Sequence, residues 1–295
     1  MTYNRITTST IASHALQGIQ ASQSRLATLQ SQLSSGKALQ KPSDDPAGVS
    51  SALSLRSELA RLTQYDRNTA DGQAWLGTID STLQTMVGAA NRVRDIVVQG
   101  SSTGSMSATA RQALATEVAG LRQSLLGDAN TTYLGRPVFG GTTSGAAAYD
   151  ATGAYVGDAQ VVTRRVADGQ TVRVDLTGPE AFSAGGTDLF ALLSKIETDL
   201  TGTTANLAGD LTSLDAVLGS MRTGLADVGA RSARLDSLSQ TAQLRSVDVS
   251  SALSNVEDVD TAKAILELNV RQAAYTASLQ ATAKVIQPSL MDYLR

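Results

Sequence analysis

Apolar residues recur every three or four positions near both ends of the chain. This spacing predicts one helix from about Arg5 to Ser35 and another, near the end of the chain, that Pro288 terminates. The first stripe comprises Leu16, Ile19, Leu26, Leu29 and Leu33, and the second comprises Ile265, Leu268, Tyr275, Leu279 and Ile286, with Leu290 after the proline. Because the two stripes match in length and kind, we expect the helices to pair as a coiled coil and to form an assembly interface.

Longer helices are predicted between these two. Alternating steps of three and four extend one helix over residues 46–99 and another over 211–256, and a shorter helix with apolar positions at 114–125 returns after a Gly/Ser-rich break at 100–107. A helix over 46–99 would be roughly 80 Å long at 1.5 Å per residue. These lengths predict an elongated rod.

The middle of the chain has a different pattern of apolar and polar residues. Short alternating segments at 161–166 and 171–176 flank Asp168-Gly169, which is the signature of a β-hairpin. One face should carry the apolar side chains and the opposite face should carry Thr171, Arg173 and Asp175.

The predicted fold is therefore mainly α: an elongated coiled-coil rod of long antiparallel helices from both termini, with a small β-rich insertion in the middle of the chain. We expect three domains. They are a terminal coiled-coil assembly domain (1–42 and 258–295), an α-helical rod (43–140 and 188–257) and a small β outer domain (141–187).

The stretch "LSSGKALQKPSDDPAG" at 33–48 could be a phosphate loop, a carboxylate site or a joint. A P-loop needs a glycine five positions before its Gly-Lys, where Ser31 stands, and adjacent carboxylates point apart rather than sharing a proton. We interpret it as an inter-domain joint, with the residues Gly36, Pro42, Asp44, Asp45, Pro46, Gly48 and, on the C-terminal side, Asp258 and Asp260.

Each joint residue has an expected role. Gly36 should stop the first helix in the left-handed conformation, and Pro42 should keep the connector extended. Asp45 should cap the helix that begins at Pro46 by accepting a hydrogen bond from the amide of Gly48. Asp258 and Asp260 are expected at a helix start, with loose cation binding as the alternative.

Composition narrows the function. The 295 residues include no cysteine and one histidine, His14, which argues against disulfides, thiol catalysis and common metal sites, so no cofactor, metal or enzyme activity is expected. The net charge of −3, without basic runs interleaved with aromatics, argues against nucleic acid, and no apolar run approaches the ~20 residues of a membrane span.

Low charge also suits self-association. Charged residues are 17% of the chain, against roughly 25% in an average domain. Helices with so few charges can be buried between copies without leaving charged side chains buried and unpaired. We expect the terminal helices to be poorly ordered in a single copy and to order when copies pack together.

Several segments resemble one family. "LSSG" with "PSDDPAG" is similar to the N-terminal signature of bacterial flagellins and flagellar hook-associated proteins, and "NRVRDIVVQG" and "LSNVEDVDTAKAILELNVRQAAYTASL" are similar to the family's helical regions. The turn "GRPVFGGT" at 135–142 and the ending "SLMDYLR" favour the branch that joins hook to filament. Pro137 in that turn and the short β insertion are departures from the pattern.

The resemblance implies a structural, non-enzymatic role in the bacterial flagellum, outside the cell. It implies export through the flagellar type III apparatus without a cleaved signal, and self-association in a helical assembly between hook-associated protein 1 and flagellin. It also implies an export chaperone bound by the C-terminal helix, residues 260–295. Filament flagellin is the first alternative, and a cytoplasmic coiled-coil scaffold is the second.

Overall fold

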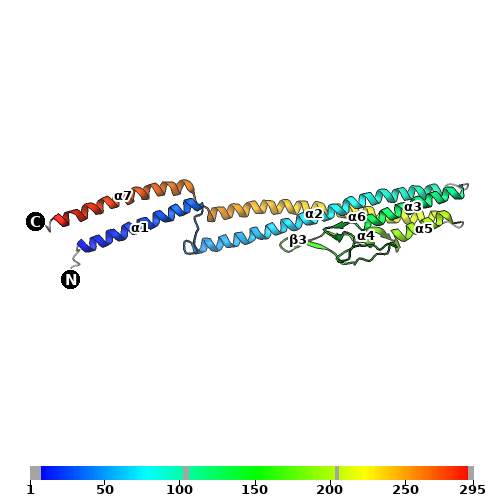
Figure 1. Ribbon diagram of the computed structural model, residues 1–295, viewed down its shortest axis with the longest axis horizontal. Helices are drawn as coiled ribbons and strands as arrows, with labels where there is room; N and C mark the ends of the chain where they lie inside the picture. Colours follow the sequence, from blue (N-terminus) through cyan, green and yellow to red (C-terminus); the bar gives the residue numbers. More distant parts are fainter. Residues whose placement is uncertain (1–7, 102–105, 203–205, 292–295) are drawn as a thin grey trace. The chain divides into compact units, whose positions relative to one another are not determined.

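The computed structural model describes residues 8–101, 106–202 and 206–291, without the side chains at 8, 9, 11, 12 and 284–291. This part of the chain is mainly α-helical, with long helices from both termini and a small strand-containing middle region, as predicted (Figure 1). It divides into two compact units. We call residues 1–60 with 246–295 the terminal unit and residues 61–245 the central unit.

The terminal unit pairs the two ends of the chain. Helices α1 (Thr8–Ser35) and α7 (Thr261–Met291) lie side by side and antiparallel (Figure 1). The predicted end of the last helix at Pro288 is wrong, because α7 continues through the proline to Met291. A proline removes one backbone donor and strains the preceding turn, but close to a helix end few bonds remain to be lost.

Each of the two long helices, α2 (Pro46–Ser101) and α6 (Leu207–Glu257), contributes residues to both units. In the central unit they are antiparallel, because Arg94 pairs with Asp215 at 2.7 Å and, earlier in α2, Gln73 donates to Asp236 at 2.6 Å. Gly72 does not interrupt α2. A Cβ there would lie 3.0 Å from Val174, so the glycine lets the chain approach closely.

The predicted periodicity identifies the core of the central unit. Its positions in α2 and α6 are mostly buried, including Trp75, Ile79, Met86, Val93, Ile96, Leu214, Leu218, Met221, Val228 and Leu235. Helices α3 (Ala108–Ala129) and α5 (Leu189–Thr201) pack on each other beside them. The sequence reading placed α5 within the rod without recognising it as a separate helix.

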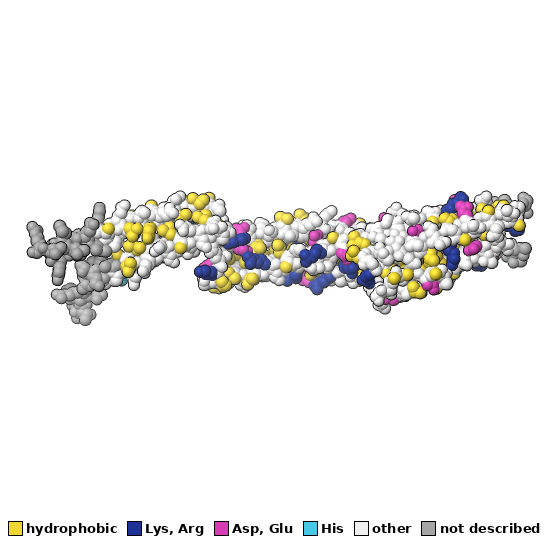
Figure 2. All heavy atoms as spheres, in the orientation of Figure 1, with side chains coloured by type: hydrophobic (Ala, Val, Ile, Leu, Met, Phe, Trp, Pro, Cys, Tyr) yellow, Lys and Arg dark blue, Asp and Glu magenta, His cyan; other side chains and the backbone are white. Residues whose placement is uncertain are grey.

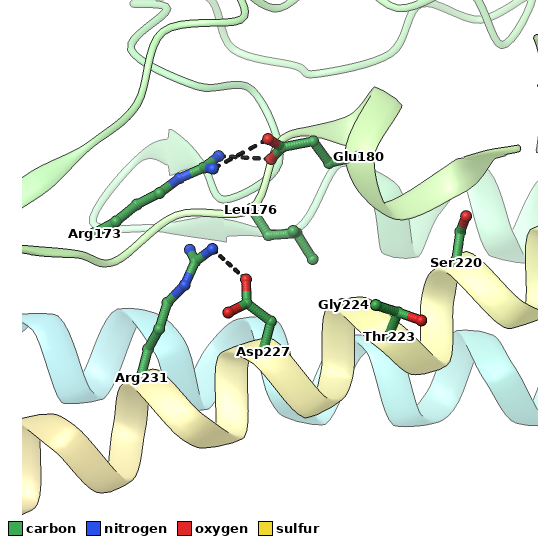
Figure 3. A pocket seen from close by; sticks show the side chains of 8 residues that line it. All are labelled: Arg173, Leu176, Glu180, Ser220, Thr223, Gly224, Asp227 and Arg231. Carbon is green, nitrogen blue, oxygen red and sulfur yellow. Dashed lines mark hydrogen bonds and ion pairs between the residues drawn. The ribbon is translucent and has the colours of Figure 1, made fainter.

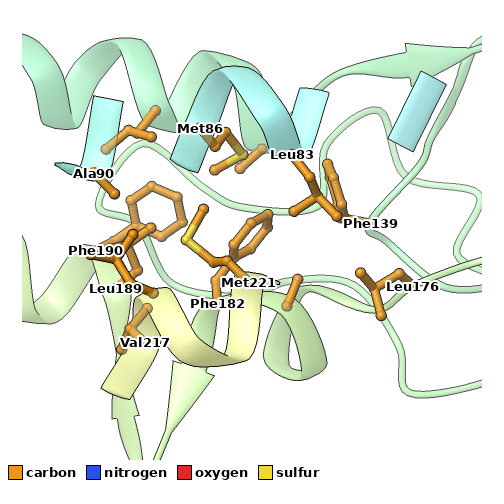
Figure 4. Close-up of a cluster of buried hydrophobic side chains, with 14 of the residues drawn as sticks. Leu83, Met86, Ala90, Phe139, Leu176, Phe182, Leu189, Phe190, Val217 and Met221 are labelled. Carbon is orange, nitrogen blue, oxygen red and sulfur yellow. The ribbon is translucent and has the colours of Figure 1, made fainter. Parts of the chain in front are cut away.

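Aromatic side chains fill the space between these helices and the strands. Phe139 meets Phe182 edge to face at 4.9 Å between ring centroids, and Tyr149 meets Phe190 at 4.7 Å. Figure 4 shows the phenylalanines lying between side chains of α2, such as Met86, and side chains of α6. Most of the chain's few aromatic residues are therefore concentrated where the strand region meets the helices.

The described strands form three short antiparallel hairpins. They are β1–β2 (Thr132–Tyr133, Arg136–Pro137), β3–β4 (Thr163–Ala167, Gln170–Arg173) and β5–β6 (Ser183–Ala184, Thr187–Asp188). The hairpin predicted around Asp168-Gly169 is β3–β4. A five-residue helix, α4 (Gly178–Phe182), follows it and begins with a capping box of Thr177 and Glu180.

Asp175 is buried, although it lies on the polar side of this hairpin. It was expected on the same face as Arg173, opposite the apolar side chains, and its carboxylate accepts a hydrogen bond from Arg173 Nε at 2.8 Å. The residue is nevertheless fully buried and lies just beyond the end of β4. The polar face of the hairpin is therefore not all exposed.

The turn of β1–β2 contains a strained leucine. Leu134 has a φ of 49° and Gly135 has a φ of 77°, as in a type I′ turn, where asparagine is favoured at the first position. Leu134 is 80% exposed, so burial offers no compensation. We expect Leu134→Asn to raise the free energy of unfolding by about 1 kcal/mol in thermal denaturation.

The matched control is Leu244→Asn in α6, where the leucine is 70% exposed and helical. There the substitution should lower stability by about 0.5 kcal/mol, because asparagine is a weaker helix former. Equal effects at the two sites would contradict the strain at Leu134.

Candidate assembly surface and joint

The α1–α7 pair buries little apolar surface within one copy. Of its predicted stripe, Ile19, Leu26, Leu29, Leu33, Leu268 and Tyr275 are half-buried. Leu16, Ile265 and Leu279, expected in the seam, are 56%, 51% and 41% exposed. Ala264, one position before Ile265, is buried instead, because the helix is rotated relative to the expected stripe. The side chains of Ile286 and Leu290 lie outside the described part.

The structure also shows an apolar face that the sequence reading missed. Leu266 and Val270, one helical turn apart on α7, are 67% and 61% exposed, and together with Ile265 we call them the outer face of α7. Figure 2 shows hydrophobic side chains gathered on the α1–α7 pair. The sole Lys, Arg, Asp or Glu in α1 is Arg25. Such a surface is typical of a protein–protein contact.

The joint begins as predicted and then turns. Gly36, with a φ of 70°, follows the last residue of α1. Pro42 does not keep the connector extended, because it lies in a turn that the Asp44 amide closes onto the Lys41 carbonyl at 3.0 Å. Its fixed φ suits the second position of a turn. The Asp44 carboxylate supports the turn by accepting from the amides of Gln40 and Lys41.

Helix α2 begins at Pro46 as predicted, and only the hydrogen-bond partner of its cap differs. The Asp45 carboxylate accepts from the amide of Ala47 at 3.1 Å, not from that of Gly48. A Cβ at Gly48 would lie 2.5 Å from the same carboxylate, so a glycine is needed beside the cap. On the C-terminal side, Asp260 accepts from the amide of Lys263 at 3.0 Å and stands before α7, as expected of a helix start.

Asp258 does not begin a helix but joins an ion-pair cluster. Lys37 Nζ lies 2.6 Å from Asp258 and 3.2 Å from Glu257, and Arg56 of α2 lies 2.5 Å from Glu257. We call these four residues the joint cluster. The sequence reading missed Lys37, Arg56 and Glu257, because residues about two hundred positions apart give no local signal.

Backbone bonds tie the same segments together. The amide of Ala38 donates to the carbonyl of Glu257 at 2.7 Å, and the amide of Val259 donates to the carbonyl of Gly36 at 3.0 Å. The connector thus forms a short antiparallel bridge with the corner between α6 and α7. The hydrogen bond from Arg56 lowers the pKa of Glu257, and that from Lys37 lowers the pKa of Asp258.

A cavity of about 180 Å³ lies beside the joint cluster. Its walls are mainly apolar, with Leu39, Pro42, Val49, Ala52 and Leu53, and Arg56 and Glu257 also line it. Leu53 is 59% exposed. Within the terminal unit this is a second apolar surface open to solvent.

The central unit has a larger, polar cavity of about 390 Å³ between α6 and the segment from β4 to α4 (Figure 3). Its charged groups are already paired with one another. Arg173 lies 2.6 Å from Glu180 and Arg231 pairs with Asp227, while Arg231 also donates to the carbonyl of Asp175. We interpret these ion pairs as a network that holds the segment from β4 to α4 against α6.

Within the described ranges, no group of three or more His, Asp or Glu is placed to hold a metal ion. No described helix has an apolar stretch long enough to span a bilayer.

Comparison with known proteins identifies relatives of this chain. The family model for the bacterial flagellin N-terminal helical region matches residues 6–144, and that for the C-terminal helical region matches 211–294, together about three quarters of the chain. Flagellar hook-associated protein 3 of Escherichia coli is 28% identical, over 94% of this chain and 95% of its own. Flagellin of Bacillus subtilis is 25% identical, over 86% and 87%.

A solved structure of similar fold is the flagellar junction protein FlgL from Legionella pneumophila. It covers 71% of this chain and 100% of its own, with a TM-score of 0.56 and 16% identity, so it bears on the fold alone. The sequence matches reach both helical ends, where the assembly surface and the joint lie. The chain belongs to the bacterial flagellin and flagellar hook-associated protein family.

Proposed function

We propose that this chain is a structural component that joins the flagellar hook to the flagellin filament. The observation that carries the proposal is the similarity to hook-associated protein 3 over nearly the full length of both chains. The outer face of α7 supports self-association, because an exposed apolar helix face with few charges nearby suits packing between copies. Residues 1–42 with 258–295, 43–140 with 188–257, and 141–187 would be the assembly, rod and outer domains.

The proposal includes a route and partners. The chain is exported by the flagellar type III apparatus without a cleaved signal, and the C-terminal helix binds an export chaperone on the way. Outside the cell it packs between hook-associated protein 1 and flagellin. The joint residues then connect an assembly helix pair to the rod helices, and no catalytic step is involved.

A deletion tests the proposal. Cells lacking this chain should keep their hooks, lose their filaments and release flagellin into the medium, and the wild-type gene should restore filaments. Normal filaments in the deletion strain would refute the proposal. In wild-type cells, electron microscopy with immunogold labelling of this chain should show label only at the hook end of each flagellum.

Filament flagellin remains the second candidate, because the Bacillus subtilis flagellin also aligns over most of this chain. It makes a different prediction in the same strain. Loss of the filament protein itself would leave no flagellin in the medium, and the immunogold label would run along the whole filament.

A further inference from the structure

The joint cluster connects three segments of the terminal unit. Lys37 belongs to the connector after α1, Arg56 to α2, and Glu257 and Asp258 to the corner between α6 and α7. Two backbone hydrogen bonds and three ion pairs thus hold the connector and α2 against that corner. The cluster can form only when the connector and α2, near the start of the chain, lie beside the α6–α7 corner, near its end.

Glu257 is the centre of this arrangement. The residue is only 5% exposed, although Lys37 and Arg56 reach it from the surface with side chains that are 44% and 57% exposed. A carboxylate so buried needs its cationic partners, because a buried charge that loses them is strongly destabilising. Glu257 therefore links Lys37 and Arg56 to the short backbone bridge, with its carboxylate in contact with both cations and its carbonyl bonded to the amide of Ala38.

The connector is the part that this cluster holds in place. Apart from its turn at Lys41–Asp44, it forms no helix or long strand of its own, and its bonds to the α6–α7 corner involve Gly36, Ala38 and Lys37. With those bonds open, the connector would be held only by its own turn and by its hydrogen bonds to the end of α1, such as that from Gln32 to the carbonyl of Ala38 at 2.9 Å. With them closed, the start of α7 and the end of α1 are fixed at the same corner.

We infer that the joint cluster is a latch, and that it must be closed for the α1–α7 pair to be held in the orientation that lets copies of this chain associate. The inference rests on the proposed self-association. Glu257 is a positioning residue in this scheme: it does not contact a second copy but fixes the helices that do. Opening the latch should therefore weaken association while leaving the outer face of α7 chemically unchanged.

Hydrogen exchange on the full-length chain tests the latch directly. In Glu257→Gln, which keeps the shape and removes the charge, exchange at the amides of Ala38 and Val259 should become at least about tenfold faster. Amides in the middle of α2 within the central unit report whether the rest of the protein stays folded. The matched control is Glu267→Gln, since Glu267 forms an exposed pair with Arg271 on α7 and should leave both joint amides unchanged.

Association is measured on the same proteins by sedimentation over a concentration series. Glu257→Gln should associate at least about tenfold more weakly than wild type, while Glu267→Gln should match wild type. Unchanged exchange at Ala38 and Val259 would overturn the latch, and faster exchange with unchanged association would overturn its role in assembly.

Failure of the wild-type chain to associate at any concentration would refute the proposed self-association, and with it the inferred role of the latch. The exchange measurement compares each variant with wild type at the same concentrations, dilute and concentrated, because the terminal helices are expected to be poorly ordered in a single copy. The double variant Arg56→Gln with Glu257→Gln gives a further check: if the two residues form one unit, exchange at Ala38 should equal that of Glu257→Gln alone.

Discussion

Replacing Arg173 with methionine should lower the free energy of unfolding by about 3 to 5 kcal/mol, because it leaves the Asp175 carboxylate buried without its cation. Arg173 holds Asp175 through Nε at 2.8 Å and Glu180 through both terminal nitrogens, at 3.0 and 2.6 Å. Asp175 is fully buried, whereas the Arg173 side chain is 24% exposed. Chemical denaturation of the purified protein measures the loss.

The control for this experiment is Arg92→Met. Arg92 pairs with Glu117 at the surface, where the two side chains are 55% and 39% exposed, and such a pair contributes within about 1 kcal/mol. If both substitutions lowered the free energy of unfolding by a similar amount, the Arg173 network would be no more stabilising than a surface ion pair, and the prediction would be contradicted.

The same network predicts a pH dependence. The hydrogen bond from Arg173 lowers the pKa of Glu180 from 4.5 to about 2. A carboxyl whose pKa is depressed by folding adds stability above its unfolded pKa and loses it as pH falls toward the folded pKa. The stability contributed by Glu180 should therefore decline between about pH 4.5 and 2 in the wild type. In Arg173→Met that part of the decline should be smaller, because only the hydrogen bonds from Thr177 then lower the pKa of Glu180.

The helices could be predicted because their signal is local. A three/four spacing of apolar residues reports which face is buried, whatever that face packs against, and the positions from Trp75 to Ile96 are accordingly mostly buried. The hairpin at Asp168-Gly169 could be predicted for the same reason, since two adjacent residues, Asp and Gly, are enough to indicate its turn.

The failures share a different cause. Asp175 is buried beside α6, whose Arg231 donates to its carbonyl, and the role of Asp258 depends on Lys37, more than two hundred positions away. Ile265 is exposed because a small rotation of α7 brings Ala264 inward, which a stripe of every third or fourth residue cannot resolve. Pairing partners and helix rotation are tertiary properties, so spacing alone could not supply them.

The terminal and central units differ in how they are stabilised. The central unit buries aromatic and aliphatic side chains completely, among them Trp75, Phe139 and Phe182. In the described part of α1, by contrast, no side chain is fully buried, and on α7 Ile265, Leu266 and Val270 are more than half exposed. Since burial of apolar surface is the main favourable term in folding, the α1–α7 pair gains most from a second copy.

The double substitution Leu266→Ser with Val270→Ser should abolish self-association without unfolding the single chain. Both residues are mostly exposed, so the free energy of unfolding of the monomer should change by less than about 1 kcal/mol. In an assembly, two such side chains buried against a neighbour contribute about 3 to 6 kcal/mol, so their loss should weaken association at least about a hundredfold. Sedimentation and electron microscopy of the assembled protein measure the effect.

The matched control is Val156→Ser with Val161→Ser in the Gly-rich middle region, where the valines are 53% and 49% exposed. Those residues lie in the segment expected to face outward, so removing a similar amount of exposed apolar surface there should leave association intact. If both double variants associate like the wild type, the outer face of α7 is not the contact between copies. If both lose association equally, general loss of surface hydrophobicity, rather than a specific α7 contact, explains the result.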